Sequence, residues 1–558
     1  MTLLKSVLRW GSIGLGVGIG VALADFLVTF TTHGDTFVSC KETYALLAIV
    51  SLVYVVPGFV VGCVAGIVPR LKETSGWWLP LLAFIIAGVP FFLLRTEEHV
   101  VQDGIDGTVS KTAPRDVLWI VIDTLRADSL YGEDLSFPDA PNLGALARES
   151  VIFTEAEAPS GWTIPSVAGL LTGMHPATLG ARNGLLPSGA MTIAELLRSA
   201  GWQTSAHIDN TLLRPSNGFA AGFDRFQKRV PMDFCWAMQA ATFLPFDTRG
   251  GLRNIIPISY GGATRLIDGA IADLEASDDD PLFLYVHAMD VHEPYWSGFD
   301  DDALKQAAQG LSDMGTLGRW KARKRVNFLT PELRKTIRDL HNAELSHVDR
   351  ELGRLIQRFG ELRDFEDAII VVTSDHGEEF WEHGMYGHGH ALWGEVVRVP
   401  MFVRFPAGVL PEAGGLHYER PVSLIDVVPT VVDVLGLSLS DAAWEFEGRS
   451  LLPAMRGESI SHVSLHSEQF TKNREIHRWR EEDMVLVHGE FPDGREKVWL
   501  FDVRADPDEE HDLAPERSDD VARLRNALET HLRTISRGGS EFAGDAVPNT
   551  QGLRDLGY

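Results

Sequence analysis

The chain has 558 residues, of which 45% are hydrophobic, and a formal net charge of −27 at pH 7. A chain of this length can bury a large core without covalent staples, and its three cysteines provide no disulfide framework. Residues 1–95 hold six basic and four acidic side chains, so the remainder carries −29 and would repel polyanions, which argues against nucleic acid as a partner.

Three long apolar segments, residues 10–30, 44–68 and 77–94, lie at the start of the chain. Each is close to the roughly 17 to 25 residues that a membrane-spanning helix needs. A cleaved signal peptide is the alternative for the first segment, but its length and the two segments that follow favour three retained helices. We therefore expect residues 1–95 to form a membrane domain with three transmembrane helices.

Basic residues around these segments predict the orientation. Lys5 and Arg9 flank the first segment, and Arg70 and Lys72 lie between the second and the third. Such positive charges stay on the cytoplasmic side of a membrane. Three crossings then place the chain after Arg95 outside the cytoplasm, so we expect a multi-pass protein of the cell (inner) membrane with its catalytic domain on the exocytoplasmic side.

The rest of the chain divides into a linker (96–114), a catalytic domain (115–455), a C-terminal subdomain (456–537) and a tail (538–558). Strands and amphipathic helices alternate in the catalytic domain, which predicts an α/β fold with a mostly parallel sheet sandwiched by helices. The predicted strands are 116–123, 282–289 and 368–373, and the predicted helices are 140–149, 192–200, 263–276 and 332–360. Short alternating segments at 463–470, 484–488 and 498–502, followed by a helix at 518–537, predict the separate C-terminal subdomain.

The predicted helix over 332–360 has one apolar stripe at helical spacing, formed by Leu345, Val348, Leu352 and Leu355. This stripe is expected to face the core. The neighbouring Glu344 and Asp349 are expected on the solvated side of the same helix.

Two apolar runs end in residues that can bind a metal. Residues 116–123 (DVLWIVID) close on Asp123, and residues 368–377 (AIIVVTSDHG) place Asp375 and His376 just beyond the last apolar position. Buried parallel strands have this composition, and side chains beyond their carboxyl ends lie in the functional crevice of an open α/β sheet. Ordinary turn chemistry is the alternative for either run alone.

Thr163 precedes Pro165 and an apolar helical stretch in residues 158–173 (APSGWTIPSVAGLLTG). A helix N-terminus favours an anion such as a phosphoryl or sulfuryl group, although a helix N-cap is the alternative role for this threonine. A threonine hydroxyl is a very weak acid, so its attack near neutral pH needs a base or a metal. We therefore expect four residues to surround one cation, namely Asp123, Thr163, Asp375 and His376.

His292 and His388 are the candidates for substrate contact and for the general acid. A phosphoryl transition state needs positive or donor groups around it, and imidazole transfers protons near neutral pH. The same pair, with His287 and Asp290, could instead hold a second metal. His287 alternates with apolar residues of its strand, so burial without chemistry is the expectation for it.

These blocks together resemble the sulfatase family of the alkaline phosphatase superfamily. IDTLRAD (122–128) is similar to the opening strand of the family, TIPS (163–166) to its nucleophile motif and TSDHGEE (373–379) to its second metal motif. LFLYVHAMDVHEPY (282–295) resembles the segment that carries the substrate histidine, which corresponds to His292. The resemblance spans about 115–515 and implies an alkaline-phosphatase-like fold with a small antiparallel C-terminal subdomain, and a substrate or leaving-group contact for His388.

The sequence departs from this family at the nucleophile. True sulfatases carry a Cys or Ser that is oxidised to formylglycine, whereas this chain has Thr163, which cannot give that aldehyde, and Val167 replaces the arginine of the motif. The resemblance therefore points to the branches that use an unmodified threonine, such as phosphoethanolamine and phosphoglycerol transferases. We expect a phospho-Thr163 intermediate that water or an acceptor hydroxyl resolves, with a membrane lipid or surface-polymer headgroup as the substrate.

One divalent metal ion is expected as the cofactor. Strict sulfatases use calcium, but here Thr124 stands where a second family aspartate often lies and His376 supplies nitrogen, which favours manganese or zinc. A sulfuric ester hydrolase and a catalytically silent binding protein are the alternative functions. The sequence does not predict the oligomeric state.

Overall fold

The structure is a computed structural model that describes residues 115–181, 184–187, 189–210, 212–228, 262–293, 295, 330–411, 413–437, 445–458, 464–471, 474–490 and 494–538. The three predicted membrane spans, the linker and the chain after residue 538 lie outside these residues. None of the helices within the described ranges is both long and apolar enough to cross a membrane.

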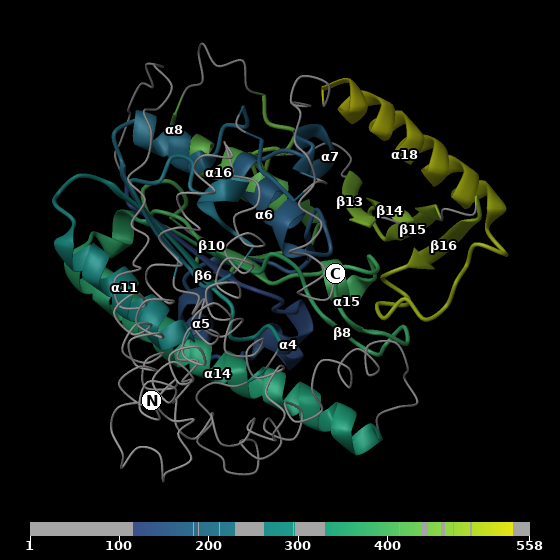
Figure 1. Cartoon of the computed structure of the whole chain (residues 1–558), viewed down its shortest axis with the longest axis horizontal. Helices are drawn as coiled ribbons and strands as arrows, with labels where there is room; N and C mark the ends of the chain where they lie inside the picture. The colour runs from purple at the N-terminus through teal and green to yellow at the C-terminus, as the bar shows by residue number, and fades with distance from the viewer. Residues whose placement is uncertain are drawn as a thin grey trace, which may run out of the picture. The chain divides into compact units, whose positions relative to one another are not determined.

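An eight-stranded mixed sheet forms the centre of the catalytic part (Figure 1). Its strand order is β11-β2-β10-β7-β1-β6-β4-β5, in which β7, β1, β6, β4 and β5 run parallel and β10 runs antiparallel to β7 and β2. The predicted α/β fold with a mostly parallel sheet is therefore confirmed. The strands are β1 (Val117–Ile122), β2 (Val151–Phe153), β4 (Gln203–Ile208), β5 (Arg225–Lys228), β6 (Leu282–Ala288), β7 (Ile369–Thr373), β10 (Met401–Arg404) and β11 (His417–Tyr418).

The three strands expected from the apolar runs lie side by side at the middle of this sheet. Every residue of β1, β6 and β7 is buried, because each of these strands has neighbours on both edges and is covered on both faces. Val121 of β1 pairs with His287 of β6 and with Thr373 of β7. The carboxyl ends of the three strands therefore lie at the same level.

Helices cover both faces of the sheet. α5, α11 and α14 bury their apolar sides against β1, β6 and β7, and Figure 1 shows α6, α8 and α16 on the opposite side. The helices of the catalytic part are α4 (Ala127–Tyr131), α5 (Pro141–Ala147), α6 (Thr163–Thr172), α7 (Pro176–Leu179), α8 (Ile193–Ser199), α11 (Gly262–Ala276), α14 (Pro331–Leu362), α15 (Gly394–Val397), α16 (Val427–Val434) and α17 (Leu452–Met455). Two small sheets, β3 (Ala156–Glu157) with β12 (Val422–Ser423) and β8 (Glu379–Phe380) with β9 (Tyr386–Gly387), complete this part.

The long helix α14 corrects one expectation from the sequence. Its stripe of Leu345, Val348, Leu352 and Leu355 is buried as predicted, but Glu344 and Asp349 are buried as well and do not face solvent. Asp349 accepts hydrogen bonds from the backbone N–H groups of Asn142 (3.1 Å) and Leu143 (2.8 Å), at the start of α5. A buried carboxylate that satisfies orphan helix N–H groups cannot be distinguished from a solvated one by sequence spacing.

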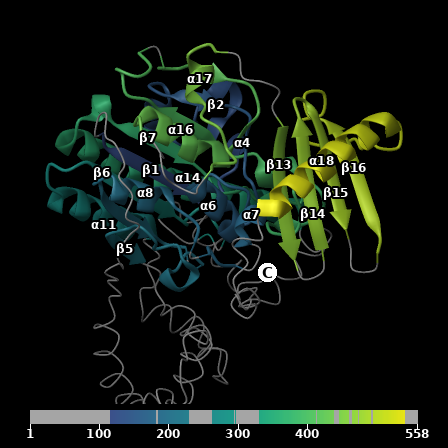
Figure 2. The ribbon, with the colours of Figure 1, turned by 90° about the horizontal axis from the view of Figure 1, so that it is seen from above.

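The C-terminal subdomain is a four-stranded antiparallel sheet with one helix across it (Figure 2). It consists of β13 (Ser464–Thr471), β14 (Arg474–Glu481), β15 (Met484–Glu490), β16 (Glu496–Asp502) and α18 (Ser518–Gly538). The sequence prediction lacked β14, whose residues are REIHRWRE.

Buried ion pairs explain this charged strand. Arg478 and Arg480 point into the interface with the catalytic part, where both contact the carboxylate of Glu157 on β3 at 3.2 and 2.8 Å. Arg478 also lies 2.7 Å from Glu509. Burial alone would oppose ionisation of Glu157, but the two arginines lower the pKa of its carboxyl group to about 2.

Candidate active site

The carboxyl ends of four adjacent parallel strands supply the polar residues of one buried cluster. Asp123 follows β1, Asp375 and His376 follow β7, Asn210 follows β4, and His287 lies on β6. All five side chains belong to residues that are almost completely buried. The structure thus brings together the residues that the two apolar runs predicted, and it adds two more.

One oxygen of Asp123 is fully occupied by donors. Asn210 Nδ2 donates to Asp123 Oδ2 at 2.6 Å, and His287 Nε2 lies 3.1 Å from the same oxygen. The other ring nitrogen of His287 lies 3.0 Å from the hydroxyl of Tyr285, which donates to it. Oδ1 of Asp123, in contrast, is buried without a hydrogen-bond partner among the described residues.

Asp375 shows the same division between its two oxygens. Oδ1 accepts from the backbone N–H groups of His376 (2.9 Å) and Thr124 (3.3 Å), whereas Oδ2 is buried without a hydrogen-bond partner in the described part of the chain. The ring of His376 lies beside this oxygen. Its Nδ1 is 3.0 Å from the carbonyl oxygen of Gly377, and since a carbonyl can only accept, Nδ1 carries the proton and Nε2 carries the lone pair.

His376 Nε2 lies close to both of the bare carboxylate oxygens. His376 Nε2 lies 3.5 Å from Asp375 Oδ2 and 3.9 Å from Asp123 Oδ1. Donor atoms bound to one cation at about 2.0–2.2 Å in tetrahedral geometry are roughly 3.4 Å apart. The two bare carboxylate oxygens and the imidazole lone pair therefore fit a divalent cation with little movement.

The electrostatics of the pair point in the same direction. Burial opposes the charge on Asp123, but the hydrogen bond from His287 and the nearby imidazoles hold the pKa of Asp123 below its usual range. Burial and the charge of Asp123 together raise the pKa of Asp375 well above its usual range. Two adjacent buried carboxylates cannot both ionise without a compensating cation, so a bound metal would relieve this repulsion.

His287 has a supporting role in this geometry. It was expected only to be buried, and it is, but its ring nitrogen also lies within 4.8 Å of carboxylate oxygens of Asp123 and Asp375. Both of its nitrogens are engaged, one with Asp123 and one with Tyr285, so it holds a carboxylate in place and offers no lone pair to a cation.

Thr163 lies next to this cluster at the first residue of α6. The N-cap of this helix is Trp162, and the Thr163 side chain caps no backbone N–H group, which excludes the structural alternative of an N-cap. Its Oγ1 lies 3.3 Å from His376 Nε2 and 3.4 Å from Asn210 Nδ2. The hydroxyl is therefore completely buried and is directed at the group that faces the two bare carboxylate oxygens.

A hydrogen bond between elements fixes the position of this helix end. Ser166, one turn into α6, donates through Oγ to the backbone carbonyl of Asp375 at 2.6 Å. Ser374 completes the connection, because it accepts from the backbone N–H of Leu125 after β1 (2.9 Å) and donates to the carbonyl of His376 (2.7 Å). The loops after β1 and β7 and the start of α6 therefore form one hydrogen-bonded unit.

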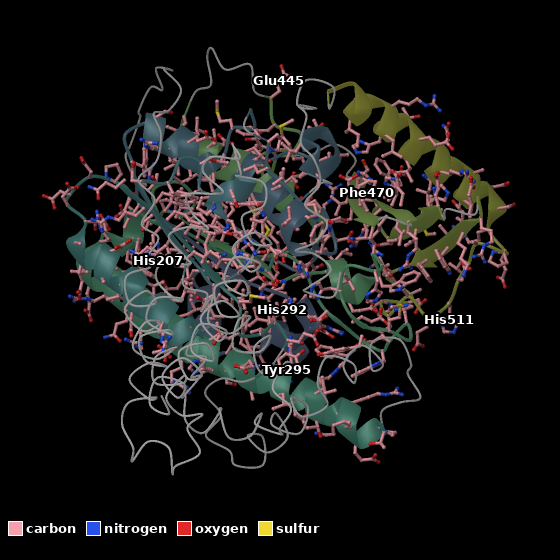
Figure 3. The ribbon with its side chains drawn as sticks, in the orientation of Figure 1. His207, His292, Tyr295, Glu445, Phe470 and His511 are labelled. Atoms are coloured by element: carbon pink, nitrogen blue, oxygen red, sulfur yellow. The ribbon has the colours of Figure 1, made fainter. Side chains whose placement is uncertain are left out.

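His292 and His388 lie together beside His376. The ring centroids of His292 and His388 are 4.9 Å apart, and those of His376 and His388 are 4.5 Å apart. Figure 3 shows His292 near the middle of the described core, close to Tyr295 and away from His207 on the α11 side. Both predicted histidines therefore adjoin the candidate metal residues.

Each of these two histidines has one fixed nitrogen. His388 Nδ1 lies 3.0 Å from a carboxylate oxygen of Glu378, so this nitrogen donates. His292 Nδ1 faces the carbonyl oxygen of Glu293 and must donate to it, which leaves the lone pair of the neutral ring on Nε2. Burial lowers the pKa of His292 to about 4 and favours this neutral form.

The structure does not gather the proposed second metal set. Asp290 instead accepts a hydrogen bond from the backbone N–H of Ala263 at 3.1 Å, at the start of α11. His287, the other member of that set, is engaged with Asp123 and Tyr285. Among the described residues, no group of three or more close metal-ligand atoms includes Asp290, His292 or His388.

Asn210 was missed by the sequence analysis. It follows Asp209 at the end of β4 (QTSAHI), a strand whose mixed composition gives no clear apolar run. The polar pair Asp209 and Asn210 directly after a strand was the available signal, but it could be used only once β4 had been recognised as a strand.

Comparisons with known proteins agree with this architecture. The family model described as Sulfatase matches residues 115–437. A choline-sulfatase from Rhizobium meliloti (strain 1021) is 26% identical over 446 residues, which are 72% of this chain and 83% of that protein. A human N-sulphoglucosamine sulphohydrolase is 26% identical over 347 residues, 57% of this chain and 62% of that protein.

The fold is also similar to solved structures. The crystal structure of a phosphonate monoester hydrolase of Agrobacterium radiobacter superposes with a TM-score of 0.55 at 20% identity. The match covers 76% of this chain and 96% of that one. At this level of identity the likeness concerns the fold alone.

Proposed function

The chain belongs to the sulfatase family of ester hydrolases, and on that premise we propose that it is a metal-dependent hydrolase or headgroup transferase of phosphate esters or diesters that forms a phospho-Thr163 intermediate. The observation that carries this proposal is the nucleophile position. Thr163 is buried at the start of α6 with its hydroxyl 3.3 Å from His376 Nε2, and a threonine cannot be oxidised to the aldehyde that sulfate-cleaving relatives need.

The residues that would hold the cation are Asp123, Asp375 and His376, with Thr163 as the fourth ligand. Two carboxylates, one imidazole and one hydroxyl suit manganese or zinc better than calcium, which prefers six to eight oxygen ligands. When bound, the metal would lower the pKa of the Thr163 hydroxyl and neutralise charge on the phosphoryl group.

The chain itself supplies the remaining groups of the reaction. Thr163 Oγ, whose proton passes to solvent when the hydroxyl ionises, forms a bond to phosphorus while the bond between phosphorus and the leaving oxygen breaks. Asn210 Nδ2, 3.4 Å from Thr163 Oγ1, is a donor that stabilises the negative charge on the attacking oxygen. The free N–H groups at the start of α6 favour the phosphoryl anion at the same place.

Protons are assigned to the two histidines by their fixed nitrogens. His388 Nδ1 donates to the carboxylate of Glu378, and in the imidazolium form of this ring Nε2–H donates to the leaving oxygen. His292 holds its lone pair on Nε2 and accepts the proton of the water or acceptor hydroxyl that attacks phosphorus in the second step. That attack breaks the bond to Thr163 Oγ and restores the free threonine.

Trapping of the intermediate tests this proposal. The purified full chain, loaded with manganese or zinc, is incubated with bis(p-nitrophenyl) phosphate, quenched in acid and analysed by intact mass and peptide mapping. We expect a phosphorus-containing adduct on Thr163, its persistence in Thr163→Ser, and its loss in Thr163→Val or after removal of the metal with a chelator. Thr172→Val is the matched control, because this threonine lies on the same helix. Its hydroxyl donates to the carbonyl oxygen of Ala168 at 2.7 Å and does not take part in the cluster.

An adduct that persists in Thr163→Val would exclude Thr163 as the nucleophile. Sulfate ester hydrolysis is the second candidate, since the two relatives above are by name a choline-sulfatase and a sulphohydrolase. Release of sulfate from p-nitrophenyl sulfate, lost in Thr163→Val and without any phosphorus adduct, would establish that candidate in place of the first.

The apolar segments at residues 10–30, 44–68 and 77–94 support a membrane location for this activity. We place the catalytic domain on the exocytoplasmic side and assign it a lipid or surface-polymer headgroup as substrate. The acidic surface disfavours nucleic acid, and the metal cluster can still accept one anionic headgroup. Protease added to spheroplasts should digest the catalytic domain while a cytoplasmic marker survives, and protection of the domain would contradict this orientation.

A further inference from the structure

Three histidines from distant parts of the chain converge outside the active site. His175 directly precedes α7, His466 lies on β13 and His531 lies on α18. One ring nitrogen of each lies within 4.8 Å of the others. The ring centroids are 5.4 Å apart for His175 and His466, 4.8 Å for His175 and His531, and 4.9 Å for His466 and His531.

Two of the three rings bury a nitrogen that could coordinate a metal. Nδ1 of His175 and Nε2 of His531 are buried and have no hydrogen-bond partner within the part of the chain that the structure describes. Burying such polar groups without partners is costly.

The third ring is oriented by a chain of hydrogen bonds. His477 Nε2 lies 3.0 Å from a carboxylate oxygen of Glu475, and His477 Nδ1 lies 3.0 Å from His466 Nε2. The carboxylate can only accept, so His477 donates to it and in turn accepts from His466 Nε2–H. The lone pair of His466 is therefore on Nδ1. A ligand histidine whose second nitrogen donates to a supporting group is the usual arrangement in metal sites.

We propose that His175, His466 and His531 bind one divalent transition-metal ion, zinc by ligand type, that fastens the catalytic part of the chain to the C-terminal sheet and helix. Three imidazoles suit zinc, with a water molecule as the fourth ligand. Glu468, whose carboxylate lies within 4.8 Å of a ring nitrogen of His466, provides opposite charge nearby.

The position of the site explains its effect. Figure 2 shows α7 beside β13 and α18, where the catalytic part meets the subdomain. His531 follows Leu524 and Leu528 on the inward side of α18 and contacts Trp479 with ring centroids 5.1 Å apart. An ion held by all three histidines therefore ties α7 to two elements that lie about 290 and 355 residues further along the chain.

Metal stoichiometry separates this site from the catalytic one. The full chain is prepared without a histidine tag, stripped with a chelator and titrated with Co²⁺, which replaces zinc and gives visible absorption in tetrahedral nitrogen sites. In an Asp375→Asn background, in which the catalytic cluster is disabled, we expect one equivalent of tightly bound cobalt with this absorption. His531→Gln in the same background should lose that equivalent, whereas His511→Gln, which changes a highly exposed histidine at the edge of the subdomain (Figure 3), should keep it.

Thermal stability gives a second measurement of the histidine site, in chains that keep the catalytic cluster intact. Zinc in excess should raise the Tm of the stripped wild-type chain and of His511→Gln by a few degrees more than that of His531→Gln. Absence of bound cobalt in Asp375→Asn would overturn the proposal even if His531→Gln failed to fold. Equal cobalt binding in Asp375→Asn with and without His531→Gln would overturn it as well. Neither result depends on phosphatase or sulfatase activity, so failure here leaves the proposed function untouched.

Discussion

Asn210 provides the sharpest test of the candidate active site, because it contacts both the candidate metal ligand Asp123 and Thr163. Its Nδ2 donates to Asp123 Oδ2 at 2.6 Å and lies 3.4 Å from Thr163 Oγ1. Its Oδ1 accepts from the backbone N–H of Leu212 at 2.7 Å and thereby closes a local turn. Asn210→Ala removes all three interactions, and Asn210→Asp keeps the acceptor of the turn but replaces the donor by an oxygen.

The magnitude follows from the charge of the partner. A hydrogen bond to an ionised group contributes about 1.5–3 kcal/mol, and each 1.4 kcal/mol corresponds to a factor of ten, so loss of this donor should lower kcat/KM by about 10- to 150-fold. Removal of groups that support metal ligands typically costs about 10- to 100-fold in metal affinity, which is the same range. Asn210→Asp should lose at least as much as Asn210→Ala, because two carboxylate oxygens would then face each other inside the protein.

The assay measures kcat/KM with bis(p-nitrophenyl) phosphate at saturating metal, together with metal affinity by competition with a chelating dye. Asn217→Ala is the matched control, since Asn217 lies in the same segment and its side chain donates to the Leu212 carbonyl at 2.9 Å. A folded Asn210→Ala chain with kcat/KM within about twofold of the wild type would refute this reasoning. So would full activity in Asn210→Asp beside an inactive Asn210→Ala, which would assign the effect to the turn.

Three further predictions follow from the described contacts. Glu378→Gln, which removes the charged partner of His388 Nδ1, should lower kcat by about 10-fold or more with little change in KM and should shift the alkaline limb of the pH–rate profile to lower pH, because a general acid must keep its proton; an unchanged profile would speak against His388 as the acid. Arg478→Met leaves Glu157 and Glu509 short of a buried cation and should cost about 3–5 kcal/mol in urea unfolding, whereas Arg525→Met, whose partners Glu496 and Glu529 are exposed, should cost less than about 1 kcal/mol. Burial lowers the pKa of His341 to about 4, so between about pH 6.5 and pH 4 the unfolded chain binds a proton that the folded chain does not. The free energy of unfolding should therefore fall by about 3 kcal/mol as the pH falls through that window, and His341→Phe should flatten this part of the plot of unfolding free energy against pH.

The sequence alone was sufficient for the centre of the fold. Strands β1, β6 and β7 are continuous apolar runs because they are buried on both faces, so composition reveals them directly. Polar residues immediately after such runs were then the natural candidates, and Asp123, Asp375 and His376 do lie together. Thr163 was accessible because proline and an apolar stretch mark the start of a helix.

Residues whose role depends on strand order were not accessible in this way. His287 alternates with apolar neighbours, and nothing in its own strand shows that β6 lies beside β1 with His287 opposite Val121, two residues before Asp123. The sequence analysis treated burial and function as alternatives for His287, but the structure shows a buried residue that also supports a candidate metal ligand. β14 was missed for a related reason, since its arginines are neutralised by Glu157, which lies more than 300 positions earlier in the chain.

The same interface links the C-terminal subdomain to catalysis. β13 runs along the segment just before Thr163, where Glu468 N–H donates to the Pro159 carbonyl (2.9 Å), Ser160 Oγ donates to the Glu468 carbonyl (2.7 Å) and Ser467 Oγ donates to the Ala158 carbonyl (2.6 Å). A nucleophile must be held within a fraction of an ångström of its attacking position, and loops are positioned less well than strands. The subdomain pairs with this loop as a neighbouring strand would. Changes that loosen the subdomain should therefore lower the proposed activity, although none of its described residues lies in the candidate active site.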